Sequence, residues 1–79
     1  MPKAKYEGIY KDLRHRIEKG EYLKGTLLPT EHSLIEVYQC SRNTLRRAIA
    51  QLGEEGYVQS MQGRGVRVIY QPDRQRRYT

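Results

Sequence analysis

The sequence predicts a small, mainly α domain in which three short helices precede a β-hairpin, the arrangement called a winged helix-turn-helix. Apolar residues recur with helical spacing in three segments, and only the dipeptide QC separates the second segment from the third. Two strand-favouring runs then flank the short loop QGRG. With 79 residues, the chain can form one small hydrophobic core.

The first helix is expected to begin at Tyr6. Its apolar stripe has i, i+3, i+4 spacing and consists of Tyr6, Ile9, Tyr10, Leu13 and Ile17. Gly20 is a suitable C-terminal cap, and the turn-rich stretch GEYLKG leads from it to Gly25. Residues 1–5 lack this pattern and are predicted to form a disordered lead.

The second helix is expected within the stretch LLPTEHSLIEVY. The hydroxyl of Thr30 can accept a hydrogen bond from an unpaired N–H of the first turn, and the carboxylate of Glu31 suits the positive end of the helix dipole. Its buried face is expected to contain Leu34, Ile35 and Tyr38.

The third helix is expected to follow Ser41, a second N-cap, and to end between Gly53 and Gly56. Its buried residues have i, i+3, i+4 and i+7 spacing and are Leu45, Ala48, Ile49 and Leu52. Its outward face carries Arg42, Asn43, Arg46 and Arg47.

The hairpin is predicted from two runs rich in strand-favouring residues, 57–61 and 66–70. Residues 6–70 therefore make up the predicted winged-helix domain. The tail QPDRQRRYT, residues 71–79, is polar, basic and interrupted by proline, so we expect a linker or a disordered end there.

The composition favours a polyanionic partner. Fifteen Lys and Arg against nine Asp and Glu give a formal net charge of +6, which in a small domain is typical of nucleic-acid binding. The chain has no apolar run long enough to span a membrane and no signal-peptide pattern, so a cytoplasmic location without membrane contact is expected.

Catalysis and metal binding find no support in the sequence. The single cysteine excludes an internal disulfide, and no Cys/His cluster has ligand spacing. There is no Gly-rich phosphate loop after a strand, and the adjacent Glu54 and Glu55 cannot face each other as an acid/base pair. We therefore expect no enzyme activity, no catalytic residues, no metal and no cofactor.

The arginines acquire a role from the helix-turn-helix geometry, which lays its second helix in the major groove of DNA. Arginine can bond guanine O6 and N7 together, and asparagine suits adenine. Base contacts are therefore predicted for Arg42, Asn43, Thr44 and Arg46. Contacts to the DNA backbone are predicted for Thr30, His32, Ser41 and Arg47. The alternative is a basic face exposed to solvent, with His32 having no role.

The loop residues Gly63, Arg64 and Gly65 form a second candidate site. Glycines permit a close approach of backbone to a partner, and an arginine at a hairpin tip can enter a minor groove. Alternatively, the loop is only a tight turn whose arginine points into water.

Two other functions remain open, since a fold does not fix a function. A winged-helix module for protein or RNA would need an apolar or aromatic patch on the third helix, where this chain has Arg and Asn. A nonspecific nucleic-acid binder would have equal affinity for all duplexes.

The motifs LLPTEHSL, SRNTLRRAIAQLGEEGYV and GRG together resemble the DNA-binding domain of GntR-family bacterial transcription regulators, within the HutC-type subfamily. The resemblance covers about residues 9–69. It implies a homodimer on a palindromic double-stranded operator, base reading by Arg42 and Arg46, and minor-groove contact by Gly63 and Arg64.

The resemblance also implies a C-terminal effector-binding domain beyond residue 79, to which the tail would be the linker. Within the family, the stretches TEHSL, SRNTLRRAI and GYVQ imply a repressor of trehalose utilisation that is induced by a sugar phosphate.

This chain departs from the family pattern at two positions of the second helix. His32 stands where an arginine is usual, so that DNA contact is either absent here or sensitive to pH. Ser33 stands where an acid commonly completes a capping box, so Thr30 is expected to cap the helix without the reciprocal bond.

Overall fold

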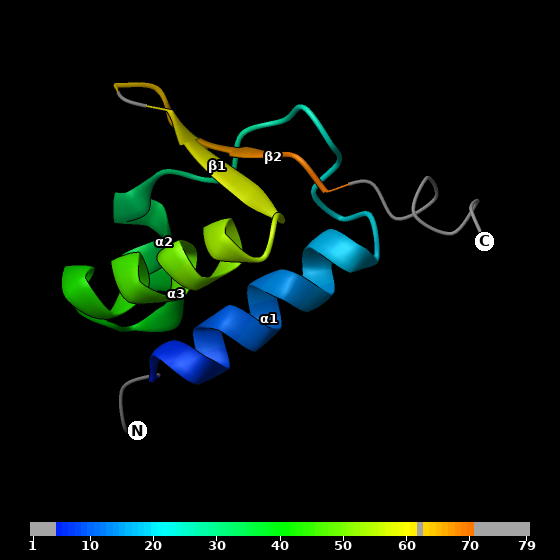
Figure 1. Ribbon diagram of the computed structural model, residues 1–79. Helices are drawn as coiled ribbons and strands as arrows, with labels where there is room; N and C mark the ends of the chain where they lie inside the picture. Colours follow the sequence, from blue (N-terminus) through cyan, green and yellow to red (C-terminus); the bar gives the residue numbers. More distant parts are fainter. Residues whose placement is uncertain (1–4, 62, 71–79) are drawn as a thin grey trace.

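The computed structural model describes residues 5–61 and 63–70. The elements are α1 (Tyr6–Glu18), α2 (Glu31–Tyr38), α3 (Arg42–Glu54), β1 (Val58–Met61) and β2 (Gly65–Val68). Three helices and an antiparallel hairpin form a winged helix, as the sequence predicts. Figure 1 shows α1 beside α3, with the hairpin projecting above them.

The two chain ends lie almost entirely outside the described residues, including most of the predicted lead and all of the predicted linker. From the lead, only Lys5 is described. It is the N-cap of α1, and its backbone carbonyl accepts hydrogen bonds from the N–H groups of Gly8 and Ile9. The first helix therefore begins at Tyr6, as predicted.

At the end of α3 the i to i−4 hydrogen bonds of the helix are replaced by bonds of other spacing. In α3, Gly56 has φ 84°, its N–H donates to the carbonyl of Gly53, and the N–H of Tyr57 donates to the carbonyl of Leu52. This pair of bonds is a Schellman motif, which needs a residue with positive φ at this place. It turns the chain directly into β1. The turn between α2 and α3 also contains a left-handed residue, Gln39, with φ 55°.

The core lies where α1, α3 and the hairpin meet, and all of its side chains are apolar or cysteine. α1 and α3 contribute the two largest sets, in agreement with the predicted stripes. The buried residues are Ile9, Leu13, Ile17, Leu28, Leu34, Cys40, Leu45, Ala48, Leu52, Val58 and Val68. Full burial of each such leucine or isoleucine contributes about 1.5–3 kcal/mol to the free energy of folding. Because one face of α3 is buried in this way, its opposite face is held towards the solvent. Tyr6, Tyr10, Ile35, Tyr38 and Ile49, expected in the core, are only partly buried at its edge.

One strand-like segment is not predicted from the sequence. The residues after Gly25 run antiparallel to β2, with Leu27 opposite Arg67. The N–H of Leu28 donates to the carbonyl of Val66 at 2.8 Å, and the N–H of Val68 donates to the carbonyl of Thr26 at 2.8 Å. β2 is therefore paired on both sides, with β1 on one edge and this segment on the other (Figure 1). Such pairing holds the wing to the helical body.

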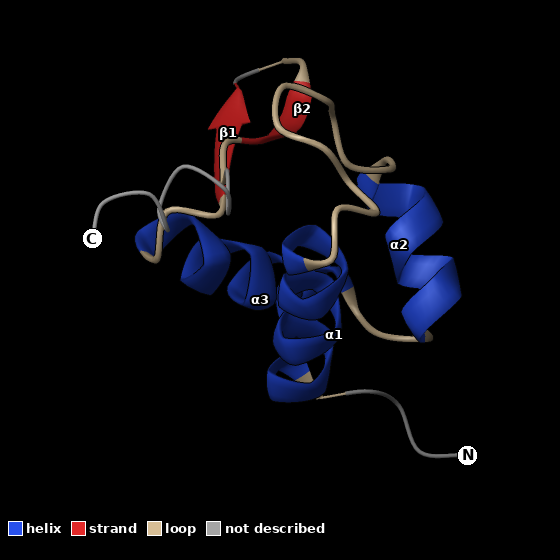
Figure 2. Ribbon diagram, turned by 90° about the vertical axis from the view of Figure 1, so that its right-hand side faces the viewer, coloured by secondary structure: helices blue, strands red, loops and turns tan. Residues whose placement is uncertain are grey.

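A polar contact fixes α2 against α1. The hydroxyl of Tyr38 donates to Asp12 Oδ2 at 2.6 Å, and Arg16 Nε donates to the same oxygen at 2.9 Å. These two bonds, that from Tyr38 first, hold the pKa of Asp12 below its ordinary value. The bond from Tyr38 therefore fixes α2, the first helix of the helix-turn-helix, to α1. Figure 2 shows the three helices grouped below the hairpin.

Among the described residues, no helix has the length and apolar character needed to cross a membrane.

Candidate nucleic-acid interface

Both helices of the helix-turn-helix begin with the hydroxyl caps that the sequence predicts. The N–H of Ser33 donates to Thr30 Oγ1 and the N–H of Thr44 donates to Ser41 Oγ, each at 3.1 Å. Each cap hydroxyl also lies within 3.0 Å of the hydroxyl three residues later. Thr30, Ser41 and Thr44, predicted as DNA contacts, therefore also fix the starts of their helices, and the expected capping by Thr30 without a carboxylate is confirmed.

Arg42 and Arg46 lie on the exposed face of α3, opposite the core residues Leu45 and Leu52, and their side chains are 62% and 63% exposed. Their i,i+4 spacing places both on one face of the helix. Both guanidinium groups lie beside the same carboxylate, that of Glu31 at the start of α2. The predicted pair of basic residues is therefore a triad with one acid.

The contacts within this triad are unequal. Arg46 Nε donates to Glu31 Oε2 at 2.7 Å and its Nη2 donates to Oε1 at 3.3 Å, whereas Arg42 Nε lies 3.2 Å from Oε1. The hydrogen bond from Arg46 is the largest cause that lowers the pKa of Glu31 below its ordinary value, and the same bond raises the pKa of Arg46. Arg46 is therefore the more firmly held of the two arginines.

The other predicted contact residues of the helices are placed differently. Asn43 is exposed in the first turn of α3. Arg47 is turned away from the pair, because its guanidinium carbon lies 4.1 Å from the ring centre of Tyr6 on α1, a cation–π contact. His32 is exposed on α2, with Nε2 3.4 Å from a carboxylate oxygen of Glu36. Arg47 and His32 are thus not grouped with Arg42 and Arg46.

The wing tip is formed by the predicted loop. The N–H of Arg64 donates to the carbonyl of Met61 at 2.8 Å, and the glycines on either side of Arg64 have φ 74° and 107°. A residue with a Cβ would be strained at these angles. The side chain of Arg64 is exposed, and no ion pair is formed with it by the described residues. Gln62, the first residue of the loop, lies outside the described residues.

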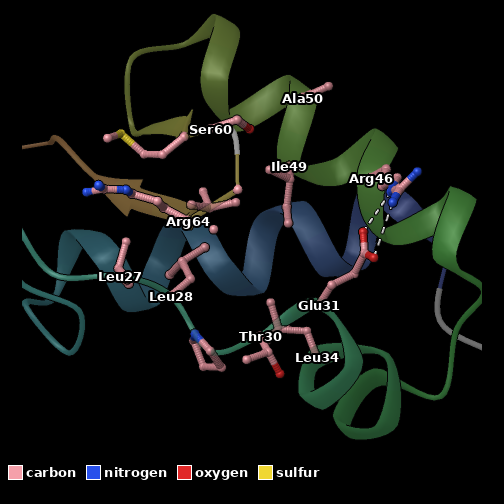
Figure 3. A pocket seen from close by; sticks show the side chains of 15 residues that line it. Leu27, Leu28, Thr30, Glu31, Leu34, Arg46, Ile49, Ala50, Ser60 and Arg64 are labelled. Carbon is pink, nitrogen blue, oxygen red and sulfur yellow. Dashed lines mark hydrogen bonds and ion pairs between the residues drawn. The ribbon is translucent and has the colours of Figure 1, made fainter.

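A groove of about 680 Å³ separates the triad from the wing tip. Its walls include the apolar residues Leu28, Leu34, Ile49 and Val66, together with Arg46 and Arg64. Figure 3 shows Arg46, bonded to Glu31, on one side of this groove and Arg64 on the other. Two exposed arginines from two different elements, Arg46 of α3 and Arg64 of the wing tip, thus line the same groove.

Three features of this surface escaped sequence analysis. The sequence predicts only a helix-dipole role for Glu31, whereas the packing of α2 against α3 brings it beside two arginines that lie 11 and 15 residues later. The contact between Arg47 and Tyr6 was also missed. Neither pairing has a local sequence signal, because each joins elements whose relative position is set by the core. The third, the pairing of residues 26–28 with β2, depends on the same tertiary arrangement.

The described residues contain no group of three or more His, Cys, Asp or Glu side chains that could hold a metal ion.

The family described as "Bacterial regulatory proteins, gntR family" matches residues 5–68 of this chain. The HTH-type transcriptional regulator TreR of Bacillus subtilis (strain 168) is 39% identical over 69 residues, which are 87% of this chain and 29% of TreR. The Exu regulon transcriptional regulator of Escherichia coli (strain K12) is 40% identical over 68 residues, 86% of this chain and 26% of that protein. The chain thus spans less than a third of these relatives, which are transcriptional regulators and not enzymes.

Solved structures with the same fold include the DNA-binding domain of AraR in complex with operator ORX1. It has a TM-score of 0.79 and 34% sequence identity, with 82% of this chain and 78% of that chain covered. The N-terminal domain of AraR in complex with mutant ORR3 has a TM-score of 0.79 and 32% identity, with 86% and 97% covered.

Proposed function

The chain belongs to the GntR family of bacterial regulatory proteins, and we propose that it is the part of a transcriptional regulator that binds a specific sequence of double-stranded DNA. The observation that carries this proposal is the placement of Arg42 and Arg46. Both are exposed near the start of α3 beside Glu31, and Arg46 lines a groove whose other side carries Arg64 of the wing tip. AraR, which has this fold, is a DNA-binding protein seen with its operators.

In this proposal, α3 enters the major groove and the wing lies along the neighbouring minor groove. The base-reading residues are Arg42, Asn43, Thr44 and Arg46. Thr30, His32, Ser41 and Arg47 contact the DNA backbone. Gly63, Arg64 and Gly65 contact the minor groove. The exposed face of α3 is charged and polar, which disfavours docking of an apolar protein surface and hence the alternative of a protein-interaction module.

The test begins with selection of bound duplexes from a random pool by the 79-residue chain. The affinity for the selected site is then compared with that for a scrambled duplex of equal composition at the same salt concentration. Because specific binding exceeds nonspecific binding by about 10³-fold or more, while a single half-site binds more weakly than a dimer on two, we expect a preference of at least tenfold. Equal affinities would identify a nonspecific binder and refute the proposal.

We further propose that the regulator acts as a homodimer on a palindromic site, with a C-terminal domain that binds an effector. The selected sequences test the first part, since a dimer requires two inverted half-sites about one helical turn apart. For this purpose the selection is repeated with the full-length regulator. If the duplexes that it selects contain only a single half-site, the homodimer proposal is contradicted.

A finer proposal is repression of trehalose utilisation, with a sugar phosphate such as trehalose 6-phosphate as the inducer. The match to TreR supports it. Since the Exu regulator is equally similar in this part of the chain, the effector decides between them. Addition of trehalose 6-phosphate to the full-length regulator bound to its operator should release the DNA, whereas trehalose and glucose 6-phosphate should not. Retention of the complex with all three compounds would refute the trehalose assignment.

A further inference from the structure

We propose that Glu31 is a positioning residue that makes Arg46 selective for its base. It holds the guanidinium by one edge and leaves the end of the group free to read guanine. This inference rests on the proposed function, in which Arg46 contacts a base. It assigns the selectivity of that contact to an acid on the preceding helix.

The geometry of the guanidinium supports this assignment. Glu31 receives hydrogen bonds from Nε and Nη2 of Arg46, at 2.7 and 3.3 Å, so it occupies one edge of the planar group. Arginine has five N–H donors in a fixed fork. Two hydrogens on Nη1 and one on Nη2 remain, and they form the end of the group. That end is suited to bond guanine O6 and N7 together, and none of the described residues accepts a bond from Nη1.

Glu31 is itself held in place. It is the first residue of α2, directly after the Thr30 cap, and its side chain is only 35% exposed. A carboxylate at this end of a helix is also favoured by the helix dipole. Because Tyr38, at the other end of α2, is bonded to Asp12 of α1, the acid stands on an element fixed to the body of the domain. Arg46 is thereby oriented by a rigid support before DNA arrives.

The charge of Glu31 has a second consequence. Without it, Arg42 and Arg46 would repel each other at i,i+4 spacing. With it, the local positive charge facing the phosphates is smaller, so every duplex is bound more weakly. The correct site regains affinity because the oriented arginine meets its base at a lower entropic cost. Glu31 should therefore increase selectivity and decrease nonspecific affinity, the pattern expected when wrong partners are disfavoured.

The variants Glu31→Gln and Glu31→Asp separate the two effects. Glutamine removes the charge, and aspartate keeps the charge on a side chain too short to hold the guanidinium edge in the same way. The matched control is Glu36→Gln, which removes an exposed carboxylate from the same helix, one that lies beside His32 and not beside the arginines. Thermal unfolding of each variant first confirms that the domain is folded.

The measured quantity is the ratio of affinities for the selected duplex and for the same duplex with the Arg46 base pair changed, at fixed salt. In both Glu31 variants the side chain of Arg46 is no longer held in one rotamer and must be ordered on binding. This cost should lower the ratio about three- to tenfold. Nonspecific affinity should rise in Glu31→Gln and stay near the wild-type value in Glu31→Asp. Glu36→Gln should leave the ratio unchanged. A wild-type ratio in both Glu31 variants would overturn the inference.

Two readouts distinguish positioning from a purely structural role. In an Arg46→Ala background, Glu31→Gln should no longer change the ratio, because the arginine through which it acts is gone. In the free wild-type domain, the Nε–H of Arg46 should give a protected NMR signal that Glu31→Ala, which removes the acceptor, abolishes. Persistence of that signal would refute the contact without reference to DNA. If the wild-type chain itself fails to discriminate between duplexes, the proposed function fails, while the NMR result still decides whether Glu31 holds Arg46.

Discussion

The two basic elements of the proposed interface differ in how their arginines are held. On α3, Arg46 is fixed by two hydrogen bonds to Glu31, and Arg42 lies beside the same acid. At the wing tip, Arg64 stands between two glycines with positive φ, and no acid occurs in the sequence from 56 to 72. The helix thus presents an oriented pair of cations, and the wing presents on a tight turn a cation that forms no ion pair with the described residues.

This difference separates two tasks of a DNA-binding surface. An arginine that must bond a particular base benefits from being oriented beforehand, since ordering a long side chain costs about 0.5–1.5 kcal/mol. An arginine that responds to groove shape and negative potential needs reach and charge more than orientation. We therefore expect substitutions on α3 to change base preference and substitutions at the wing to change affinity and its dependence on salt.

The largest effect should come from a change that displaces both arginines together. Leu45 is fully buried and lies on α3 between Arg42 and Arg46 in the sequence. Its truncation to alanine leaves a cavity, and such changes cost about 2–5 kcal/mol of folding free energy, a large share of the stability of a small domain. Urea unfolding should show the loss, and DNA binding should fall at all sites alike. Val37→Ala, at a position 69% exposed on α2, is the control and should change stability little.

The next effect should appear at Arg46. Lysine keeps the charge but lacks the planar fork with which arginine bonds Glu31 along one edge and a guanine along another. Arg46→Lys should therefore weaken binding to the selected duplex by about 1–3 kcal/mol and relax preference at one base pair, with little change on scrambled DNA. Arg42→Ala or Arg46→Ala should weaken the selected site by a similar amount. A uniform loss on all duplexes would reassign Arg46 to a backbone contact.

A smaller effect is expected at the wing. Arg64→Ala should weaken binding by about 1 kcal/mol and reduce the slope of log K against log salt by about 0.9. The loss should be greatest on duplexes with A·T-rich flanks, where the minor groove is narrow and its potential most negative. Arg64→Lys should recover most of the loss, unlike Arg46→Lys. If flanking sequence makes no difference, Arg64 contacts only phosphates.

The smallest effect is the titration of Glu31. Its pKa should lie below the ordinary value of about 4.3 because Arg46 bonds to the carboxylate, and it should rise in Arg46→Ala. Since the folded pKa is depressed, the contribution to stability is present above the unfolded pKa and is lost as pH falls through the folded one. Carbon-13 NMR of the side-chain carboxyl measures this shift. Asp12, whose partners are Tyr38 and Arg16, should keep its lowered pKa in that variant.

The helices and the hairpin could be predicted from the sequence because the residues that determine each of them lie close together in the chain. The caps Thr30 and Ser41, the i, i+3, i+4 stripe of α1 and the glycines at the wing act within one or two turns of chain. The stretch 26–28 was missed because its partner, β2, lies about 40 residues later. Its pairing satisfies backbone groups that no local pattern assigns.

What the sequence alone determined is the fold class, the bounds of the helices to within a residue or two, and the two places where arginines gather. Periodicity, capping and turn chemistry fix these, since they depend on short-range sterics and hydrogen bonds. Only the tertiary structure decided that Glu31 holds Arg46, that Arg47 turns to Tyr6, and that the wing faces α3 across a groove. Those contacts exist because burial of the apolar faces fixes how the three helices and the hairpin pack together, and this packing brings side chains that are distant in the sequence close to one another.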